Sequence, residues 1–427
     1  MTTSDKVPAG RYRDAFASTE FRVLFGALVV SMLGYVVASL AIVVLVYRRT
    51  NSPLLSALTF TTMFVPYLLG GTLLSGLVDR VPVRRLLVCC DLGGAVLVAV
   101  MTVPEVPVPA LFALLFGLSL LTPLSTGARS ALLPRVLPPE VVVPARSLFR
   151  MVSQGAQIAG YAVGGGLLAD LSPRAVLGAG VVTYAASACV LRVFLGAHPE
   201  KAHRDGPRAS LAADSLRGVG QVLRDRPLRR VLLLGWLVPL LMVVPEALAA
   251  PSAAARGLPS SATGWWLAAG PVGTVAGELA GVWLVPAARR GGLTTPLAAC
   301  GFVPLLVFVL DPSLAPALVL LAVSGLCGAY LLGLDQLLLD VTPPDLLGRA
   351  YTVNTSVLMA TQGLGFAAAG AVAEVVPPDR VIAAAGFAGL VTVAVLRAPR
   401  RADRDGQTAQ VVRRESAAGP DRHRAAS

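Results

Sequence analysis

Long apolar runs separated by short polar segments form the dominant pattern along this chain of 427 residues. Twelve of the runs are long enough to cross a hydrocarbon core of about 30 Å as an α-helix. The first six runs cover residues 23–47, 54–78, 86–104, 108–127, 147–169 and 175–195. The other six cover residues 230–250, 262–285, 293–310, 315–338, 352–375 and 380–397. The pattern therefore predicts an all-α membrane protein with twelve transmembrane helices.

The overall composition agrees with this prediction. Hydrophobic residues make up 55% of the chain, charged residues only 14%, and the mean hydropathy is +0.72. A soluble domain of this size needs more charge than that. The net charge of +12 would ordinarily suggest nucleic acid as a partner. The basic residues lie between apolar runs, however, so we expect a lipid bilayer as the partner and no nucleic acid.

The basic residues are distributed unequally between the two sides of the predicted bundle. One side includes the loop between the fourth and fifth runs, which we expect Arg129, Arg146 and Arg150 to flank. The other side carries only five of the 36 basic residues, namely Arg48, Arg49, Arg174, Arg256 and Arg380. The positive-inside rule then places both termini in the cytoplasm, as an even number of spans also requires. The first run is too long for a signal-peptide core, so we expect it to be the first span.

Several classes of chemistry lack the residues that they need. The chain has two lysines, Lys6 and Lys201, and neither lies in a Gly-x-x-x-x-Gly-Lys-Ser/Thr loop. This excludes a P-loop ATPase within the chain, so pumping must use an ion gradient or another subunit. The five cysteines lie inside apolar runs and the three histidines lie in polar segments. We therefore expect no metal and no cofactor.

The segment Gly76-Leu-Val-Asp79-Arg80-Val-Pro-Val-Arg84-Arg85 joins the second and third runs. It resembles the signature loop of the major facilitator superfamily, Gly-x-x-x-Asp-Arg-x-Gly-Arg-Arg, at Asp79, Arg80, Arg84 and Arg85. Gly76 stands one place late, and Pro82 and Val83 replace the second glycine. The resemblance implies a gating motif that stabilises one conformation through charge pairs between the halves. The alternative is that these charges only anchor the loop on the cytoplasmic side.

An internal repeat divides the apolar runs into two halves. A constant shift carries Arg84 and Arg85 onto Arg289 and Arg290, and Gln157, Gly160 and Gly165 onto Gln362, Gly365 and Gly370. The repeat predicts two pseudo-symmetric six-helix halves at residues 23–196 and 230–397, which is the major facilitator fold. Residues 1–22 and a disordered tail at 398–427 are expected in the cytoplasm. Residues 197–229 form a cytoplasmic linker, with an amphipathic helix predicted near residues 210–224.

Small residues and glutamines mark the fifth run and its repeat partner, the eleventh. These positions are Gln157, Gly160, Gly164, Gly165, Gln362, Gly365 and Gly370. Small residues at near-four spacing let helices approach closely, so we expect close packing there. The stretch Gly160–Gly166 also resembles a motif of antiporters in the same superfamily, although the proline expected after a glycine is missing.

Three acids inside the runs are candidates for carrying a coupled proton, because a buried acid in a membrane is costly and often functional. Glu278 lies about 16 Å along a helix from Arg289, which places it near the membrane midplane and makes it the best candidate by position. Glu246 is about 24 Å from Arg230, near the outer mouth of the seventh span. Asp91 is about 9 Å from Arg85, near the inner boundary. For each acid, the alternative is a packed or interfacial residue with no role in transport.

The passages at residues 130–140 and 343–350 resemble bacterial drug-efflux members of the superfamily, within a resemblance that covers residues 15–397. This resemblance implies a secondary transporter of the bacterial plasma membrane, working as a monomer by alternating access. We expect proton-coupled export of a small hydrophobic or amphipathic molecule such as a drug or secondary metabolite. Nutrient uptake by the same fold is the alternative. A sensor or an enzyme is disfavoured, since neither an output domain nor a clustered catalytic site is visible.

Overall fold

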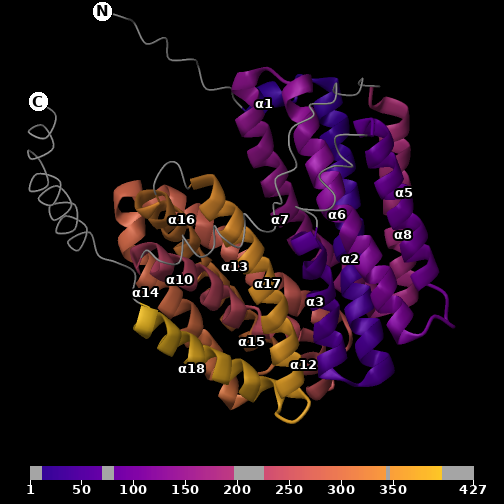
Figure 1. Cartoon of the computed structure of the whole chain (residues 1–427). Helices are drawn as coiled ribbons and strands as arrows, with labels where there is room; N and C mark the ends of the chain where they lie inside the picture. Colours follow the sequence, from indigo (N-terminus) through magenta and orange to yellow (C-terminus); the bar gives the residue numbers. More distant parts are fainter. Residues whose placement is uncertain (1–11, 70–80, 197–225, 343–346, 397–427) are drawn as a thin grey trace, which may run out of the picture.

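The computed structural model describes residues 12–69, 81–196, 226–342 and 347–396, and these residues form helices without a β-strand. Two groups of helices lie side by side in Figure 1. The first group contains α1 (Tyr12–Ala15), α2 (Thr19–Thr50), α3 (Pro53–Leu69), α5 (Val83–Met101), α6 (Val108–Val136), α7 (Pro139–Asp170) and α8 (Pro173–Phe194). The second contains α10 (Arg226–Met242), α11 (Val244–Ala247), α12 (Ala249–Ala255), α13 (Ser261–Leu284), α14 (Ala287–Leu306), η2 (Val307–Leu310), α15 (Leu314–Leu326), η3 (Cys327–Ala329), α16 (Tyr330–Val341), α17 (Leu347–Ala373) and α18 (Pro378–Leu396).

The all-α fold predicted from the apolar runs is confirmed, and the helices follow the runs in order. Within the described ranges, eight helical segments are long and apolar enough to cross a membrane. The apolar parts of α3 and α17 are shorter, and α5 and α7, with their charged or amide side chains, are not among the eight. The count of twelve spans therefore stays a prediction.

Two helix boundaries differ from the predicted ones in a way that matters for the site. Helix α6 does not end at residue 127 but continues to Val136, and α7 begins at Pro139. The seventh run is not one helix, because α10 ends at Met242 and two short helices follow. Pro245 and Pro251 lie in these short helices, and proline removes a backbone donor and clashes with the preceding turn.

Each group has its own packing. In the first group α2 packs against α7 and α8, and α5 against α6 and α8. In the second group α13 packs against α15, α14 against α18, and α10 against α17. Contacts between the groups are made chiefly by α3 with α17 and by α7 with α13. A continuous set of buried apolar residues runs through both groups.

The glycines of the internal repeat make equivalent contacts in the two groups. A Cβ atom on Gly160 would lie 2.7 Å from Cβ of Val36 on α2, the first long helix of its own group. A Cβ atom on Gly365 would lie 2.4 Å from the carbonyl oxygen of Leu240 on α10, again the first helix of its group. Such close approach requires glycine. The predicted repeat is thus matched by repeated helix contacts.

A second pair of repeat glycines joins the groups to each other. A Cβ atom on Gly165 of α7 would lie 3.0 Å from Cα of Gly264 on α13. A Cβ atom on Gly370 of α17 would lie 2.9 Å from Cα of Leu54 on α3. Each contact pairs a repeat glycine with the second long helix of the opposite group. The two groups are therefore related as the two halves of a pseudo-symmetric bundle.

The two ends of the bundle differ in their charge and in how closely the two helix groups contact each other. We call the end that bears Arg84, Arg85, Arg192, Arg289 and Arg290 the basic end, and the opposite end, with Arg174, Asp311 and Glu374, the far end. The contacts of α3 with α17 and of α7 with α13 involve the far-end halves of these helices. In Figure 1 the two groups meet at the far end and diverge toward the end that bears α1 and α16.

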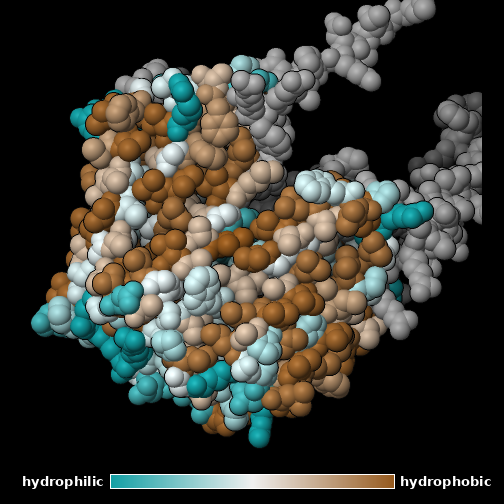
Figure 2. All heavy atoms as spheres, turned by 180° about the vertical axis from the view of Figure 1, so that it is seen from behind, coloured by the Kyte–Doolittle hydropathy of each residue, from teal (hydrophilic) through white to brown (hydrophobic). Residues whose placement is uncertain are grey.

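The flank between these ends is apolar. Figure 2 shows hydrophobic side chains over most of the face in view, with hydrophilic ones gathered toward the ends. Trp265 and Trp283 are exposed on α13 and lie about 27 Å apart along the helix at its usual rise. Tryptophan is enriched at both membrane interfaces, and this separation is close to the thickness of a hydrocarbon core. The flank is therefore suited to contact lipid.

Candidate functional site

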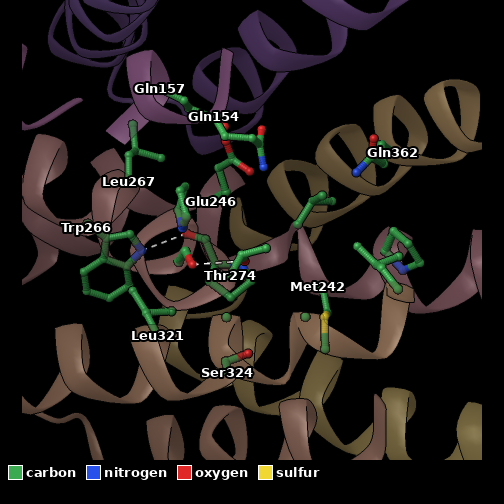
Figure 3. Close-up of a pocket in the computed structure, with 18 of the residues that line it drawn as sticks. Gln154, Gln157, Met242, Glu246, Trp266, Leu267, Thr274, Leu321, Ser324 and Gln362 are labelled. Carbon is green, nitrogen blue, oxygen red and sulfur yellow. Dashed lines mark hydrogen bonds between the residues drawn. The ribbon is translucent and has the colours of Figure 1, made fainter. Parts of the chain in front are cut away.

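A cavity of about 300 Å³ lies where α7 of the first group faces the second group. Figure 3 shows Gln154 and Gln157 of α7 on one side, close to Glu246, and Gln362 of α17 farther away on another part of the wall. Apolar side chains, among them Met242 and Leu321, line other parts of the wall. The lining therefore combines one carboxylate and the amides of Gln154, Gln157 and Gln362 with apolar side chains.

Glu246 owes its position to the break in the seventh run. It lies in α11, the short helix that follows α10, and its side chain is partly exposed and lines the cavity. The indole nitrogen Nε1 of Trp266 donates to the carbonyl oxygen of Pro245 over 2.8 Å and so fixes the adjoining backbone. Because α11 is short and proline-containing, Glu246 faces the space between the groups.

Tyr161 connects this carboxylate to the first group. Its side chain is buried in α7 and forms side-chain hydrogen bonds with Glu246 and with Gln157. Gln157 and Tyr161 are four residues apart and therefore lie on one face of α7. The contact joins α7 of one group to α11 of the other, so a rearrangement of the groups has to change it.

The other two candidate acids lie elsewhere. Glu278 is one turn beyond the cavity-lining residue Thr274 on α13, toward the basic end, and is not among the residues that line the cavity. It lies within electrostatic reach of Asp335 on α16. Asp91 is 3% exposed inside the first group. Of the three acids, only Glu246 lines this cavity, and the roles that we predicted for all three stay predictions.

Asp91 belongs to a buried polar cluster. Its Oδ2 atom accepts a hydrogen bond from Ser187 Oγ over 2.5 Å and lies 4.0 Å from Nη2 of Arg129. Arg129 also donates to Ser125 Oγ over 3.1 Å and to Ser31 Oγ over 3.2 Å. The cluster therefore joins helices α2, α5, α6 and α8.

The expectation that Arg129 lies beyond the end of the fourth run was wrong. Arg129 lies inside α6 and is 1% exposed, because α6 continues past the predicted end of the fourth run. The sequence reasoning missed it as the partner of Asp91. The signal that could have found it is the pairing of one acid with one base at similar depth in consecutive runs.

The signature loop is only partly within the described residues. Gly76, Asp79 and Arg80 lie outside them. Arg84 is described, and its guanidinium donates to the backbone carbonyl of Arg192 at the end of α8. Arg85 is exposed. The predicted gating role of this loop therefore stays a prediction. The amphipathic helix predicted near residues 210–224 lies outside the described residues and also stays a prediction.

The glutamines and glycines of the repeat fall into two sets. Gln157 and Gln362 both line the cavity, one from each group. The glycines lie at helix contacts, where Gly164 also faces Leu40 of α2. The sequence could place these residues on corresponding helices, but it missed Tyr161 and Trp266, whose roles depend on the fold of α11.

Comparison with known proteins gives a consistent result. A model of the Major Facilitator Superfamily matches residues 24–245, which is more than half of the chain. An uncharacterised MFS-type transporter of Sinorhizobium fredii, y4rN, is 28% identical over 371 residues, covering 83% of this chain and 87% of that protein. Both matches bear out the resemblance noted from the signature loop.

Solved structures share the fold. A bacterial homologue of the human lysosomal transporter Spinster, in an inward-facing and unoccupied conformation, has a TM-score of 0.63 at 16% identity, covering 88% of this chain and 94% of its own. The nucleoside transporter NupG has a TM-score of 0.69 at 12% identity, covering 88% and 99%. At these identities the likeness shows the fold alone.

Proposed function

Because this chain belongs to the Major Facilitator Superfamily, a family of membrane transporters, we propose that it is a secondary active transporter that exports a small amphipathic molecule in exchange for protons. The observation that carries the proposal is the position of Glu246. It is a carboxylate that lines a cavity between two helix groups and forms a hydrogen bond across them.

Alternating access explains why the two helix groups contact each other at the far end of the bundle and diverge at the basic end. The groups contact each other at the far end through the Gly165–Gly264 approach and the α3–α17 interface. By the positive-inside rule the basic end faces the cytoplasm of a bacterial cell, and the structure then represents an inward-facing state. Closing the basic end while opening the far end would expose the cavity to the other side.

Glu246 suits proton coupling for a geometric reason. A carboxyl group that holds a proton in one state and releases it in the other must be reachable from each side in turn. Glu246 lies between the groups and is bonded to Tyr161 of the opposite group, so movement of the groups changes its surroundings. Asp91 is enclosed within one group, and Glu278 lies outside the cavity lining.

The lining supports an amphipathic cargo rather than a phosphate or a sugar. Leu267, Leu321, Leu331 and Leu358 contribute apolar wall, and Gln154 and Gln157 supply polar groups near Glu246. Phosphates need cationic donors, and no Lys, Arg or His is among the described residues that line the cavity. Sugars need more polar lining than this wall provides.

The direction of proton movement tests the proposal. The full chain is reconstituted into liposomes that contain a pH-sensitive dye, and an inward gradient of benzyltrimethylammonium, ethidium or chloramphenicol is imposed in separate runs. Antiport predicts that at least one probe drives protons out of the liposomes. Protons that move in with the probe would show symport and uptake. Proton flux identical to that of protein-free liposomes for every probe would overturn coupled transport of this class.

A further inference from the structure

We propose, resting on the function proposed above, that the cargo carries one protonated amine on a compact apolar body and binds through Glu246. Four features of the cavity lead to this class of cargo: its charge, the remaining acceptor capacity of its carboxylate, its apolar wall and its size.

When Glu246 is ionised, the lining carries a negative charge that no cationic side chain among the described lining residues balances. Glu246 is the acid among the described lining residues, and these residues include no cationic side chain. A carboxylate in a poorly solvated cavity attracts a cation and repels an anion far more strongly than one in water. A cargo with a carboxylate or phosphate group is therefore disfavoured at this position.

The carboxylate has hydrogen-bonding capacity to offer. An ionised carboxylate accepts up to about four hydrogen bonds, and Tyr161 supplies one donor to Glu246. The side chains of Gln154 and Gln157 lie beside it in Figure 3 and can accept or donate through their amides. A primary or secondary ammonium group has two or three donors, and so fits between one carboxylate and two amide oxygens.

The aromatic ring next to this site is engaged elsewhere. Arg256 stacks its guanidinium 5.3 Å from the centre of the Trp266 ring, and the indole nitrogen is bonded to Pro245. Arg256 is itself neutralised by Asp379 at 2.5 Å and Asp311 at 3.2 Å. A cation in the cavity is thus directed to Glu246, because the indole already has its cation and its acceptor.

The remainder of the wall fixes the shape of the cargo body. Met242 and Leu321 line the cavity away from Gln154 and Gln157, and methionine adapts to varied apolar shapes. The volume of about 300 Å³ is at the low end of the range of ligand pockets, ~300–1,000 Å³. An aromatic or alicyclic body of about ten heavy atoms is of suitable size.

Binding of three matched probes tests the class of cargo without any transport. 4-Phenylbutylamine, 4-phenylbutanol and 4-phenylbutyrate share one apolar body and differ in their charge at pH 7. Each is titrated against the full-length protein in detergent, and the rise of the unfolding midpoint with concentration gives its affinity. The amine is expected to bind most tightly and the carboxylate not to bind at the concentrations that saturate the amine.

Two variants test whether Glu246 supplies the charge that attracts the amine. Glu246→Gln keeps the shape of the side chain but removes its charge, and should weaken the amine roughly tenfold to a hundredfold, with the alcohol changed less than about threefold. Glu105→Gln removes an exposed acid in the loop between α5 and α6 and should change neither. Alcohol binding as tight as amine binding, or amine binding unchanged in Glu246→Gln, would overturn the inference. Because the readout is binding alone, either result leaves the proton-flux test of antiport to stand or fall separately.

Discussion

The backbone nitrogen of Leu54 donates to Oε1 of Glu374 over 3.0 Å, and the two residues belong to opposite helix groups. The same oxygen accepts from Ser52 Oγ over 2.5 Å. Glu374 thus places a negative charge at the N-terminus of α3, where the helix dipole and the free backbone donors favour it. This contact must break whenever the far end opens.

We therefore expect Glu374→Gln to shift the protein toward the far-end-open state. Loss of one charge-assisted contact at an exposed site is worth about 1 kcal/mol, or roughly a fivefold change in the ratio of the two states. Spin labels at the exposed positions Glu105 and Leu310, in a background without the native cysteines, would measure the far-end distance distribution. Asp170→Asn, which removes another exposed far-end acid, is the control. An unchanged distribution in Glu374→Gln would show that the contact does not hold the far end closed.

The close approach of α7 and α13 gives a second prediction. A Cβ atom on Gly264 would lie 2.4 Å from Cα of Gly165 and 2.6 Å from the carbonyl oxygen of Tyr161. Gly264→Ala should separate the helices and destabilise the far-end-closed state by about 1–3 kcal/mol. Gly166→Ala is the matched control, since its added methyl group meets nothing within 4 Å. Cargo flux and the far-end distance should both change in the first variant only; equal flux in the two variants would contradict this role for Gly264.

The buried pair of Asp91 and Arg129 predicts a stability effect. Asp91→Asn leaves the Arg129 charge without its acid in a site that is 1% exposed, which should lower the free energy of unfolding by roughly 3 kcal/mol. Asp91→Asn combined with Arg129→Gln should recover part of this loss, because the uncompensated charge is gone. Thermal unfolding in detergent measures both. Equal stability of Asp91→Asn and the wild type would mean that the pair contributes little, in line with its 4.0 Å separation.

The orientation of the chain can be tested by chemical labelling. Single cysteines introduced at Asp214 in the linker and at Asp403 in the tail should react with a membrane-impermeant thiol reagent only after the cells are opened, if both segments are cytoplasmic. A cysteine in place of Glu105 at the far end should react in intact cells. Reaction of both segments in intact cells would overturn the orientation, and reaction of only one of them would overturn the count of twelve spans.

Much of the fold could be predicted because apolar runs of spanning length leave few alternatives. The order of the helices and the pairing of Gly160 with Gly365 follow from run length and repeat offset. The break between α10 and α11 could not be placed from the run, since proline is tolerated inside several helices here, such as Pro66 in α3 and Pro271 in α13. Whether a proline ends a helix depends on the neighbours that satisfy the freed backbone groups.

The site was less predictable than the fold, for a related reason. Counting residues from the basic end gives depth along a helix, and on depth alone Glu278 is the better-placed acid. Depth does not say where a cavity lies, and the cavity is set by the short helix α11 and by the approach of α7. Arg129 shows a different limit of sequence reasoning. A charged residue that follows an apolar run suggests that the helix has ended, but α6 continues through Arg129 to Val136.

The most direct test of proton exchange at Glu246 compares two glutamine variants of equal chemistry. Glu246→Gln and Glu278→Gln are reconstituted separately with a probe that drives proton movement in the wild type, and protons moved per probe molecule are counted at concentrations that saturate each variant. We predict that Glu246→Gln still exchanges labelled cargo across the membrane but moves no protons with it, whereas Glu278→Gln retains the wild-type ratio. Proton movement at the wild-type ratio in Glu246→Gln would contradict the account.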